Sequence, residues 1–296
     1  MSEPQLPGGR RPWPDDVVAR LRCPLCASAM ADSGDRLTCT ANGHSFDRAK
    51  QGLVTLRDGH AAGVQADTAE MVASRVRVLE SGTYAPLSAD LAATVSALAP
   101  DARLVVDLAG GTGHHLAAVL EPLPDAFGLD LDLSTAALKR AARLHPRMFA
   151  VGADLMRRFP LADGCADAVT SVFGPRPADE ILRILSPGAP LVVAVPTPKH
   201  LAEIVEPLGM ISVDEVKIDR LLAKLDDFDL AERHPLSFEF EADRALLYDM
   251  VMMGPSAHHV DKAELTRRLG TLSGPDDVPL AVHASVEVLA FRARGK

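Results

Sequence analysis

Short apolar runs alternate with amphipathic segments through the middle of this chain. Residues 104–106 and 148–151 are apolar without interruption, as in strands that are buried on both faces, and further runs cover 127–132, 166–173 and 191–195. Patterns of helical period occur at 69–80, 114–120, 135–144 and 178–185, with looser ones near 203 and over 214–225. Strands that alternate with helices predict an α/β fold built on a mostly parallel sheet.

A glycine-rich turn follows the first predicted strand. Before the helix over 114–120 the chain reads Asp107-Leu108-Ala109-Gly110-Gly111-Thr112-Gly113. Glycines let a backbone bend sharply against a ligand, and the N-terminus of the following helix points at the same place. About 20 residues further on, the second strand ends in carboxylates at the spacing that binds a ribose diol. We predict a nucleotide-like ligand with Asp132 at the ribose and Asp130 in reserve; a tight turn without a ligand is the alternative.

Three cysteines and one histidine near the N-terminus have the spacing of a zinc site. Cys23 and Cys26 form a C-x2-C pair, Cys39 follows after twelve residues, and His44 follows after four more. Thiolates and a neutral imidazole are ligands that Zn²⁺ takes in tetrahedral structural sites. Free thiols or a disulfide are the alternative. We expect the fourth cysteine, Cys165, to be a small buried residue.

The glycine motif, which follows a strand, resembles the first motif of class I S-adenosylmethionine methyltransferases, with Ala109 at the place of the first glycine. A methyl group is tolerable there if the backbone has ordinary dihedral angles. The resemblance implies a Rossmann-like sheet with an antiparallel edge, for which residues 236–240 and 282–291 are the candidate strands. It also implies contacts with the cofactor S-adenosylmethionine, including one from Asp154 to the adenine amino group. The cofactor-binding candidates are Asp107, Ala109, Gly111, Gly113, His115, Asp132, Asp154 and Ser171.

Motifs along nearly the whole chain resemble the 23S ribosomal RNA guanine-N1 methyltransferases that act on the hairpin 35 loop. The matching segments are 23–26, 44–47, 70–75, 81–87, 110–116 and 253–256. The branch that protects producers of macrolides such as tylosin is most similar, because the His-His pair and Met-Gly-Pro-Ser are its forms of two segments. The resemblance implies a homodimer that holds hairpin 35 of 23S rRNA between its zinc modules and catalytic domains.

Length and composition fit this organisation. The 296 residues, 47% of them hydrophobic, can form one domain of ordinary size with a small satellite. No apolar run is long enough to cross a bilayer, and we expect an acidic chain without a signal peptide in the cytoplasm. We predict a flexible tail over residues 1–20, a zinc module over 21–58, a linker with helices over 59–100 and a class I methyltransferase domain over 101–296.

Charge and missing aromatic residues weaken the prediction of an RNA substrate. The net charge is −9, whereas binding to phosphates requires a basic surface. The family's tyrosine, asparagine, histidine and tryptophan are replaced here by Leu53, Thr55, Thr83 and His258. The first 60 residues, however, carry eight Lys and Arg against seven Asp and Glu. A local basic patch on the zinc module is therefore one interpretation, and ordinary solvated side chains are the alternative. The residues concerned are Arg22, Arg36, Arg48, Lys50 and Arg57.

Transfer to guanine N1 is an in-line displacement in which N1 loses its proton, so a nearby acceptor would help. His114 and His115 begin a helix, where positive charge is disfavoured, and a neutral imidazole there could accept the proton. Phe173 and Arg176 are further catalytic candidates, because open parallel sheets bind substrates at the carboxyl ends of their strands. Packing or capping is the alternative role for each histidine, and orientation alone can supply most of the rate.

Three functions stay open, and the first of them is our prediction. They are an rRNA guanine-N1 methyltransferase, a small-molecule methyltransferase of a biosynthetic pathway, and a binding module with a decayed cofactor site. A basic, aromatic-lined surface around the zinc module would favour the first function. A closed apolar pocket over residues 173–175 would favour the second, and a blocked cofactor cleft the third.

Overall fold

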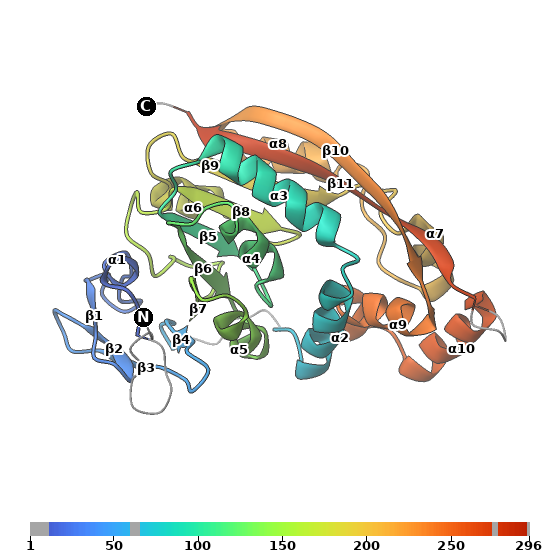
Figure 1. Ribbon diagram of the computed structural model, residues 1–296, viewed down its shortest axis with the longest axis horizontal. Helices are drawn as coiled ribbons and strands as arrows, with labels where there is room; N and C mark the ends of the chain where they lie inside the picture. The colour runs from blue at the N-terminus through green and yellow to red at the C-terminus, as the bar shows by residue number, and fades with distance from the viewer. Residues whose placement is uncertain (1–11, 60–65, 274–277, 295–296) are drawn as a thin grey trace.

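An eight-stranded sheet forms the centre of the computed structural model, which describes residues 12–59, 66–273 and 278–294. The strand order is β10-β11-β9-β8-β5-β6-β7-β4 (Figure 1). Its parallel middle consists of β5 (Leu104–Leu108), β6 (Phe127–Asp132), β7 (Met148–Gly152), β8 (Ala168–Val172) and β9 (Pro190–Pro196). At one edge β11 (Leu280–Ala293) runs antiparallel to β9, and β10 (Phe228–Ala242) runs antiparallel to β11. The predicted fold class, with its five buried strands and its antiparallel edge, is confirmed.

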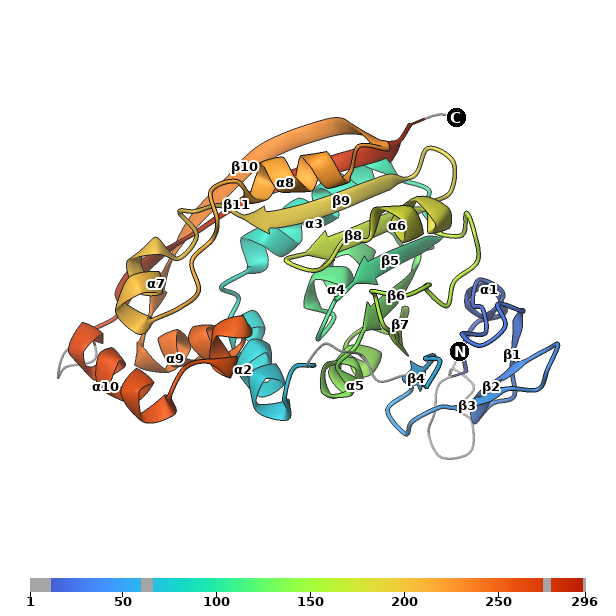
Figure 2. The ribbon, with the colours of Figure 1, turned by 180° about the vertical axis from the view of Figure 1, so that it is seen from behind.

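Helices cover both faces of this sheet. The first face carries α3 (Ala85–Leu98), α4 (His114–Leu120) and α5 (Thr135–Leu144), and the second carries α6 (Ala178–Ile184) and α8 (Lys217–Lys224) (Figures 1 and 2). Within β5, Val105 belongs to the core under the first group, and Val106 belongs to the core under the second. Successive side chains of a strand point to opposite faces, so a sheet covered on both sides requires the uninterrupted apolar run seen in the sequence.

A third group of helices stands beyond the carboxyl ends of the parallel strands. It consists of α2 (Ala69–Glu80), α7 (Ala202–Leu208), α9 (Arg244–Met252), the 3₁₀ turn η1 (Pro255–His258) and α10 (Lys262–Ser273). The buried carboxylate of Asp249 joins two of them, because it accepts hydrogen bonds from Ser74 Oγ at 2.8 Å and Arg77 Nε at 2.6 Å. None of the described helices is long and apolar enough to span a membrane.

The N-terminal module is a small antiparallel sheet that lies against the far edge of the main sheet (Figure 1). Its elements are α1 (Asp15–Val18), β1 (Met30–Asp32), β2 (Arg36–Cys39) and β3 (Ser45–Asp47). The chain then enters the main sheet as β4 (Val54–Thr55), parallel to β7. The sequence did not predict β4. The boundary expected at residue 58 therefore falls after a strand of the main sheet.

The prediction of a flexible tail over residues 1–20 is wrong for residues 12–20. Trp13 is only 4% exposed, and its ring centroid lies 5.1 Å from that of Phe149 in β7. Val17 and Val18 of α1 are buried in the same core. These side chains pack on the apolar edge of the sheet, where burial stabilises them in a fixed place. Residues 1–11 of the expected tail lie outside the described part.

Candidate functional site

The four predicted zinc ligands converge in the N-terminal module. One ligand atom from each of Cys23, Cys26, Cys39 and His44 lies within 4.8 Å of the others. Cys26 Sγ is 3.4 Å from Cys39 Sγ and 3.7 Å from His44 Nδ1. Sulfur atoms bound at 2.3 Å to a tetrahedral zinc ion lie about 3.8 Å apart, so this donor set fits Zn²⁺.

The local backbone explains why the two thiols of the C-x2-C pair meet. Ala27 adopts a left-handed conformation (φ 58°), and its N–H donates to the carbonyl of Cys23 at 2.8 Å, which closes the turn. Hydrogen bonding with Ser28 lowers the pKa of the Cys26 thiol to about 5, while burial raises the pKa of the Cys23 thiol. A thiol that ionises easily is already in the form that binds a metal.

The glycine loop after β5 is pressed against the ends of β5 and β6. A Cβ at Gly110 would lie 2.5 Å from a carboxylate oxygen of Asp107 and 2.7 Å from one of Asp130, so only glycine fits. Gly113 combines a positive φ of 80° with a position where a Cβ would meet the end of Met148 at 2.7 Å. The loop therefore leaves room for a ligand only on its outer side.

Ala109, at the place of the first glycine, does not have ordinary dihedral angles. Its φ is 57°, in the left-handed region that costs an L-residue roughly 1 to 2 kcal/mol. The condition under which a methyl group is tolerable at this position is therefore not met. The methyl group faces the loop after β8, because a Cβ at Gly174 would lie 3.0 Å from Ala109 Cβ.

Two buried carboxyl groups lie beneath the loop. Asp107 is 1% exposed and accepts a hydrogen bond from Thr170 Oγ1 at 2.7 Å. Burial raises the pKa of Asp107 to about 7. Burial and the nearby carboxylates of Asp132 and Asp107 raise the pKa of Asp130 well above its ordinary value. Asp130 is thus enclosed under the loop, whereas Asp132 stands at the outer end of the same strand.

Asp132 lies at the end of β6, beside the loop. Its Oδ2 accepts a hydrogen bond from the N–H of Gly111 at 3.0 Å, and its Oδ1 accepts one from the N–H of Ser134 at 2.6 Å. Burial raises the pKa of Asp132, and the charge of Arg75 partly offsets this effect. Each oxygen keeps further acceptor capacity, which a ribose diol can use.

Arg75 of α2 lies on the outer side of the loop and was not predicted as a site residue. A Cβ at Gly111 would be 3.2 Å from its Nη1. Its guanidinium pairs with Asp67 at 2.5 Å and donates to the carbonyl of Met253 at 2.7 Å. A sequence signal existed, because Arg75 ends the matching segment 70–75. No pattern, however, placed that helix next to the glycine loop.

The other predicted cofactor residues follow neighbouring strands. Asp154 comes just after β7, and its Oδ1 accepts from the N–H of Met156 at 2.9 Å. Ser171 is buried in β8, where its Oγ lies 3.4 Å from the carbonyl oxygen of Pro175. Both stand at the carboxyl edge that carries the loop, and their contacts with a cofactor stay predictions.

The two histidines of α4 differ in their surroundings. His115 Nδ1 lies 2.8 Å from Ser88 Oγ of α3, and burial lowers its pKa to about 4. This contact places His115 between two helices, which favours the packing alternative. His114 Nδ1 lies 2.9 Å from Thr112 Oγ1, while its Nε2 is buried with no hydrogen-bond partner among the described residues. His114 is therefore the better candidate for a functional contact.

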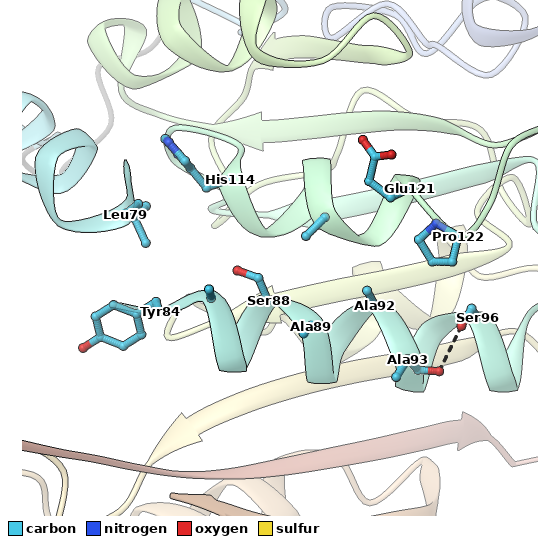
Figure 3. A pocket seen from close by; sticks show the side chains of 12 residues that line it. Leu79, Tyr84, Ser88, Ala89, Ala92, Ala93, Ser96, His114, Glu121 and Pro122 are labelled. Carbon is cyan, nitrogen blue, oxygen red and sulfur yellow. Dashed lines mark hydrogen bonds between the residues drawn. The ribbon is translucent and has the colours of Figure 1, made fainter. Parts of the chain in front are cut away.

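A cavity of about 540 Å³ lies between α3 and α4. Figure 3 shows Tyr84, Ser88 and Ala92 on its α3 side, and His114 and Glu121 on its α4 side. It is not the closed pocket over residues 173–175 that would favour a small-molecule substrate. That loop is open instead, because Phe173 is 40% exposed.

An aromatic cluster of Tyr84, Phe173 and His200 surrounds the end of β8. The Phe173 ring centroid lies 5.6 Å from that of His200 and 6.4 Å from that of Tyr84. Tyr84 Oη is 3.3 Å from His200 Nε2, and the N–H of Ser285 donates to His200 Nδ1 at 3.2 Å. Burial lowers the pKa of His200 to about 4, so its ring is neutral near pH 7. Phe173 itself is strained, with a φ of 56°.

Sequence reasoning found Phe173 but missed its two partners. Tyr84 lay within the matching segment 81–87, which was a usable signal. The sequence contains no signal for His200. This residue follows β9, and it lies near Phe173 only because β9 pairs with β8. The predicted catalytic residue Arg176 lies in the same loop as Phe173. Burial lowers its pKa to about 10, and its Nε has no hydrogen-bond partner in the described part of the chain.

The candidate basic patch on the zinc module loses one member. Arg48 is 1% exposed, donates to Asp32 at 2.7 Å and to the carbonyl of Gly34 at 2.9 Å, and stacks 5.7 Å from the Trp13 ring. Arg48 is therefore neither part of a basic surface patch nor a solvated side chain, because its buried guanidinium holds the module together. Lys50 is exposed, and Arg36 pairs with Asp35 at the surface.

Comparisons with known proteins cover both parts of the chain. A family model described as "RlmA, N-terminal", a zinc ribbon, matches residues 21–57. A 23S rRNA (guanine(748)-N(1))-methyltransferase of Streptomyces fradiae is 45% identical, over 92% of this chain and 97% of that protein. A putative 23S rRNA (guanine-N(1)-)-methyltransferase of Micromonospora griseorubida is 43% identical, over 90% and 96% respectively. A Bacillus subtilis protein described in the same words is 32% identical over 62% of this chain and 66% of its own length.

Proposed function

This chain belongs to the family of 23S rRNA (guanine-N1)-methyltransferases, and we propose that it methylates N1 of a guanine in the hairpin 35 loop of 23S rRNA. The observation that carries the proposal is 45% identity along 92% of the chain to a relative named for guanine 748. The exposed, aromatic-lined edge beside the glycine loop supports it, because a base in a large RNA needs such access.

The enzyme uses S-adenosylmethionine, which supplies an activated methyl group when it is bound. We propose that Asp132 accepts hydrogen bonds from the ribose diol and that Asp154 contacts the adenine amino group. The loop from Ala109 to Gly113 would lie along the methionine part. Arg75, whose guanidinium lies against Gly111, is placed to bind the methionine carboxylate.

The substrate base would enter at the aromatic cluster. A guanine that leaves the RNA stack needs apolar walls and a few polar contacts, and stacking on an aromatic ring contributes about 1 to 3 kcal/mol. Phe173 offers an exposed ring at the carboxyl end of β8, one strand from the glycine loop. These rings supply stacking surface although the family's aromatic residues are missing at Leu53 and His258.

The chain needs little acid–base machinery for this reaction. The N1 proton of guanine is weakly acidic, and a neutral imidazole near it can accept the proton as the methyl group is transferred. Burial lowers the pKa of His114, so its ring is neutral near pH 7, and its Nε2 has no hydrogen-bond partner in the described part of the chain. Orientation of the base by the aromatic cluster would supply most of the rate.

An assay with radiolabelled cofactor tests the proposed function. The protein should transfer label from S-adenosylmethionine to a hairpin 35 transcript, and a transcript with the target guanine replaced by adenine should stay unlabelled. Label on neither RNA would reject the proposal. Label on both would reject the assignment of the base.

We also infer three finer properties from the relatives' family. The chain would form a homodimer, act in the cytoplasm and protect its host from macrolides of the tylosin type. Light scattering of the purified protein should give twice the chain mass of 31.4 kDa. Expression in a susceptible host should raise the tylosin concentration needed to stop growth, and a variant that lacks methyl transfer should not.

A further inference from the structure

An acidic and a basic side chain face each other on the outer side of the glycine loop. Asp67, just before the N-cap residue Thr68 of α2, pairs with Arg75 of the same helix at 2.5 Å. The guanidinium of Arg75 lies against the loop, because a Cβ at Gly111 would be 3.2 Å from its Nη1. This ion pair is therefore next to the backbone that the proposed function places along the methionine part of the cofactor.

Further contacts tie Asp67 to the end of β6, where the ribose candidate lies. In both ribbon views α2 stands beside α5, the helix that Ser134 caps (Figures 1 and 2). Ser134 Oγ donates to the backbone carbonyl of Asp67 at 3.2 Å, and the N–H of Ser134 donates to Asp132 at 2.6 Å. Asp132 also accepts from the N–H of Gly111 at 3.0 Å. The contacts thus form a closed ring that joins the ion pair to the ribose candidate.

Both members of the ion pair have polar atoms left for a ligand. Each side chain keeps 25% of its surface exposed. Arg75 Nη1 pairs with Oδ2 of Asp67, and within the described ranges no N–H or O–H group donates a hydrogen bond to Oδ1. Arg75 also donates from Nη2 to the carbonyl of Met253 at 2.7 Å, and a guanidinium has more N–H donors than these contacts use.

The methionine end of S-adenosylmethionine carries two opposite charges on one carbon atom. Its carboxylate requires N–H donors, and its α-ammonium group requires acceptors. Arg75 supplies donors alone, so the ammonium group needs an acceptor beside it. Asp67 is a carboxylate in direct contact with Arg75, whereas the neighbouring Asp132 is assigned to the ribose. The ion pair is therefore complementary to both charges of the methionine end.

We propose that Asp67 accepts hydrogen bonds from the α-ammonium group of the bound cofactor while Arg75 holds its carboxylate. This inference rests on the placement of the cofactor in the proposed function, and it does not depend on which RNA base is methylated. Without a ligand the two side chains neutralise each other, and the bound methionine end would set its opposite charges against them. Asp67 binds the cofactor and takes no part in the transfer of the methyl group.

Calorimetry of the zinc-loaded full chain with two ligands tests this role. The ligands are S-adenosylhomocysteine and its analogue that lacks the α-amino group. Asp67→Asn should bind S-adenosylhomocysteine about ten- to a hundredfold more weakly than wild type, the loss expected for one hydrogen bond between charged groups. It should bind the deaminated analogue at least as tightly as wild type does, because that ligand has no ammonium group for Asp67 to contact.

Three further variants complete the comparison. Arg75→Gln should weaken both ligands, because both keep the carboxylate. Asp67→Glu keeps a carboxylate and should keep the wild-type preference for the ligand with the amino group. Asp229→Asn breaks a surface pair with Arg294 of 2.8 Å at the β10 edge, and as the matched control it should behave as wild type.

Two results would overturn the assignment of Asp67. Equal weakening of both ligands in Asp67→Asn would mean that Asp67 only orients Arg75 or supports the fold. Wild-type affinity of Asp67→Asn for S-adenosylhomocysteine would mean that Asp67 does not contact the ammonium group.

The same measurements distinguish this inference from the proposed function, because they contain no RNA. If the wild-type protein shows the expected ligand preference but does not methylate a hairpin 35 transcript, the proposed function fails and the assignment of Asp67 stands. If the wild-type protein methylates the transcript while Asp67→Asn treats the two ligands as wild type does, only the assignment of Asp67 is rejected.

Discussion

The carboxylate of Asp132 accepts a hydrogen bond of 3.0 Å from the backbone N–H of Gly111. This bond joins the end of β6 to the glycine loop after β5, and a second one from Ser134 ties the same carboxylate to the start of α5. Asp132 therefore holds the glycine loop in place beside it. The glycines and the acid are about 20 residues apart in sequence but lie side by side, because adjacent parallel strands bring their carboxyl ends together.

Replacing Asp132 should weaken cofactor binding without unfolding the enzyme. Loss of a charged acceptor costs about 1.5 to 3 kcal/mol, so Asp132→Ala should bind S-adenosylmethionine roughly ten- to a hundredfold more weakly by calorimetry. Asp130→Asn keeps the shape of the enclosed neighbour and should retain wild-type affinity. Equal affinities of wild type and Asp132→Ala would reject the ribose assignment.

Asp107 should make the cofactor-free enzyme less stable as pH rises. Its pKa is about 7 in the folded chain against an ordinary 3.8, so between these values the folded chain holds a proton that the unfolded chain has lost. The free energy of unfolding then falls by up to about 1.4 kcal/mol per pH unit from about pH 4 to 7. Asp107→Asn lacks this effect. Its stability relative to wild type should grow over that range in denaturant titrations, and a constant difference would contradict the burial argument.

Ala109→Gly should relieve backbone strain in the cofactor loop. The left-handed conformation costs alanine roughly 1 to 2 kcal/mol, of which the greater freedom of unfolded glycine removes about 0.5 to 1. The variant should be as stable as wild type or more stable by up to about 1 kcal/mol. Ala168→Gly, in the buried strand β8, is the control and should be less stable than wild type. A clear loss of stability at Ala109 would show that its methyl packing outweighs the strain.

Removing zinc should affect the main sheet as well as the zinc module. Met30 and Leu37 of the module share a core with Phe149 of β7, and β4 pairs with β7. Cys26→Ser should lose the single bound zinc, unfold the module and increase hydrogen exchange in β7. Cys165→Ser should keep one zinc per chain, because Cys165 is not near the cluster. Wild-type protein without stoichiometric zinc in elemental analysis would end this account of the module.

Local patterns predicted most of the sheet and both candidate sites. Helix bounds at 69–80, 114–120 and 135–144 agree with the structure, because an N-cap or a glycine turn marks where each begins. The four predicted zinc ligands lie close together, as their spacing predicted. The predictions that were wrong or missing depended on contacts between residues that are distant in sequence. The burial of Arg48 required Trp13 and Asp32, and the two-residue strand β4 is too short to give a pattern.

Mass spectrometry of 23S rRNA is the most direct test of the central claim, which is methyl transfer to guanine N1 in hairpin 35. Ribosomal RNA from cells that express the wild-type chain should carry one additional methyl group on a hairpin 35 guanine, with the fragmentation pattern of 1-methylguanosine. RNA from cells that express Asp132→Ala should carry much less. Hairpin 35 RNA of equal mass with and without the wild-type chain, or a methyl group at another atom or base, would contradict the account.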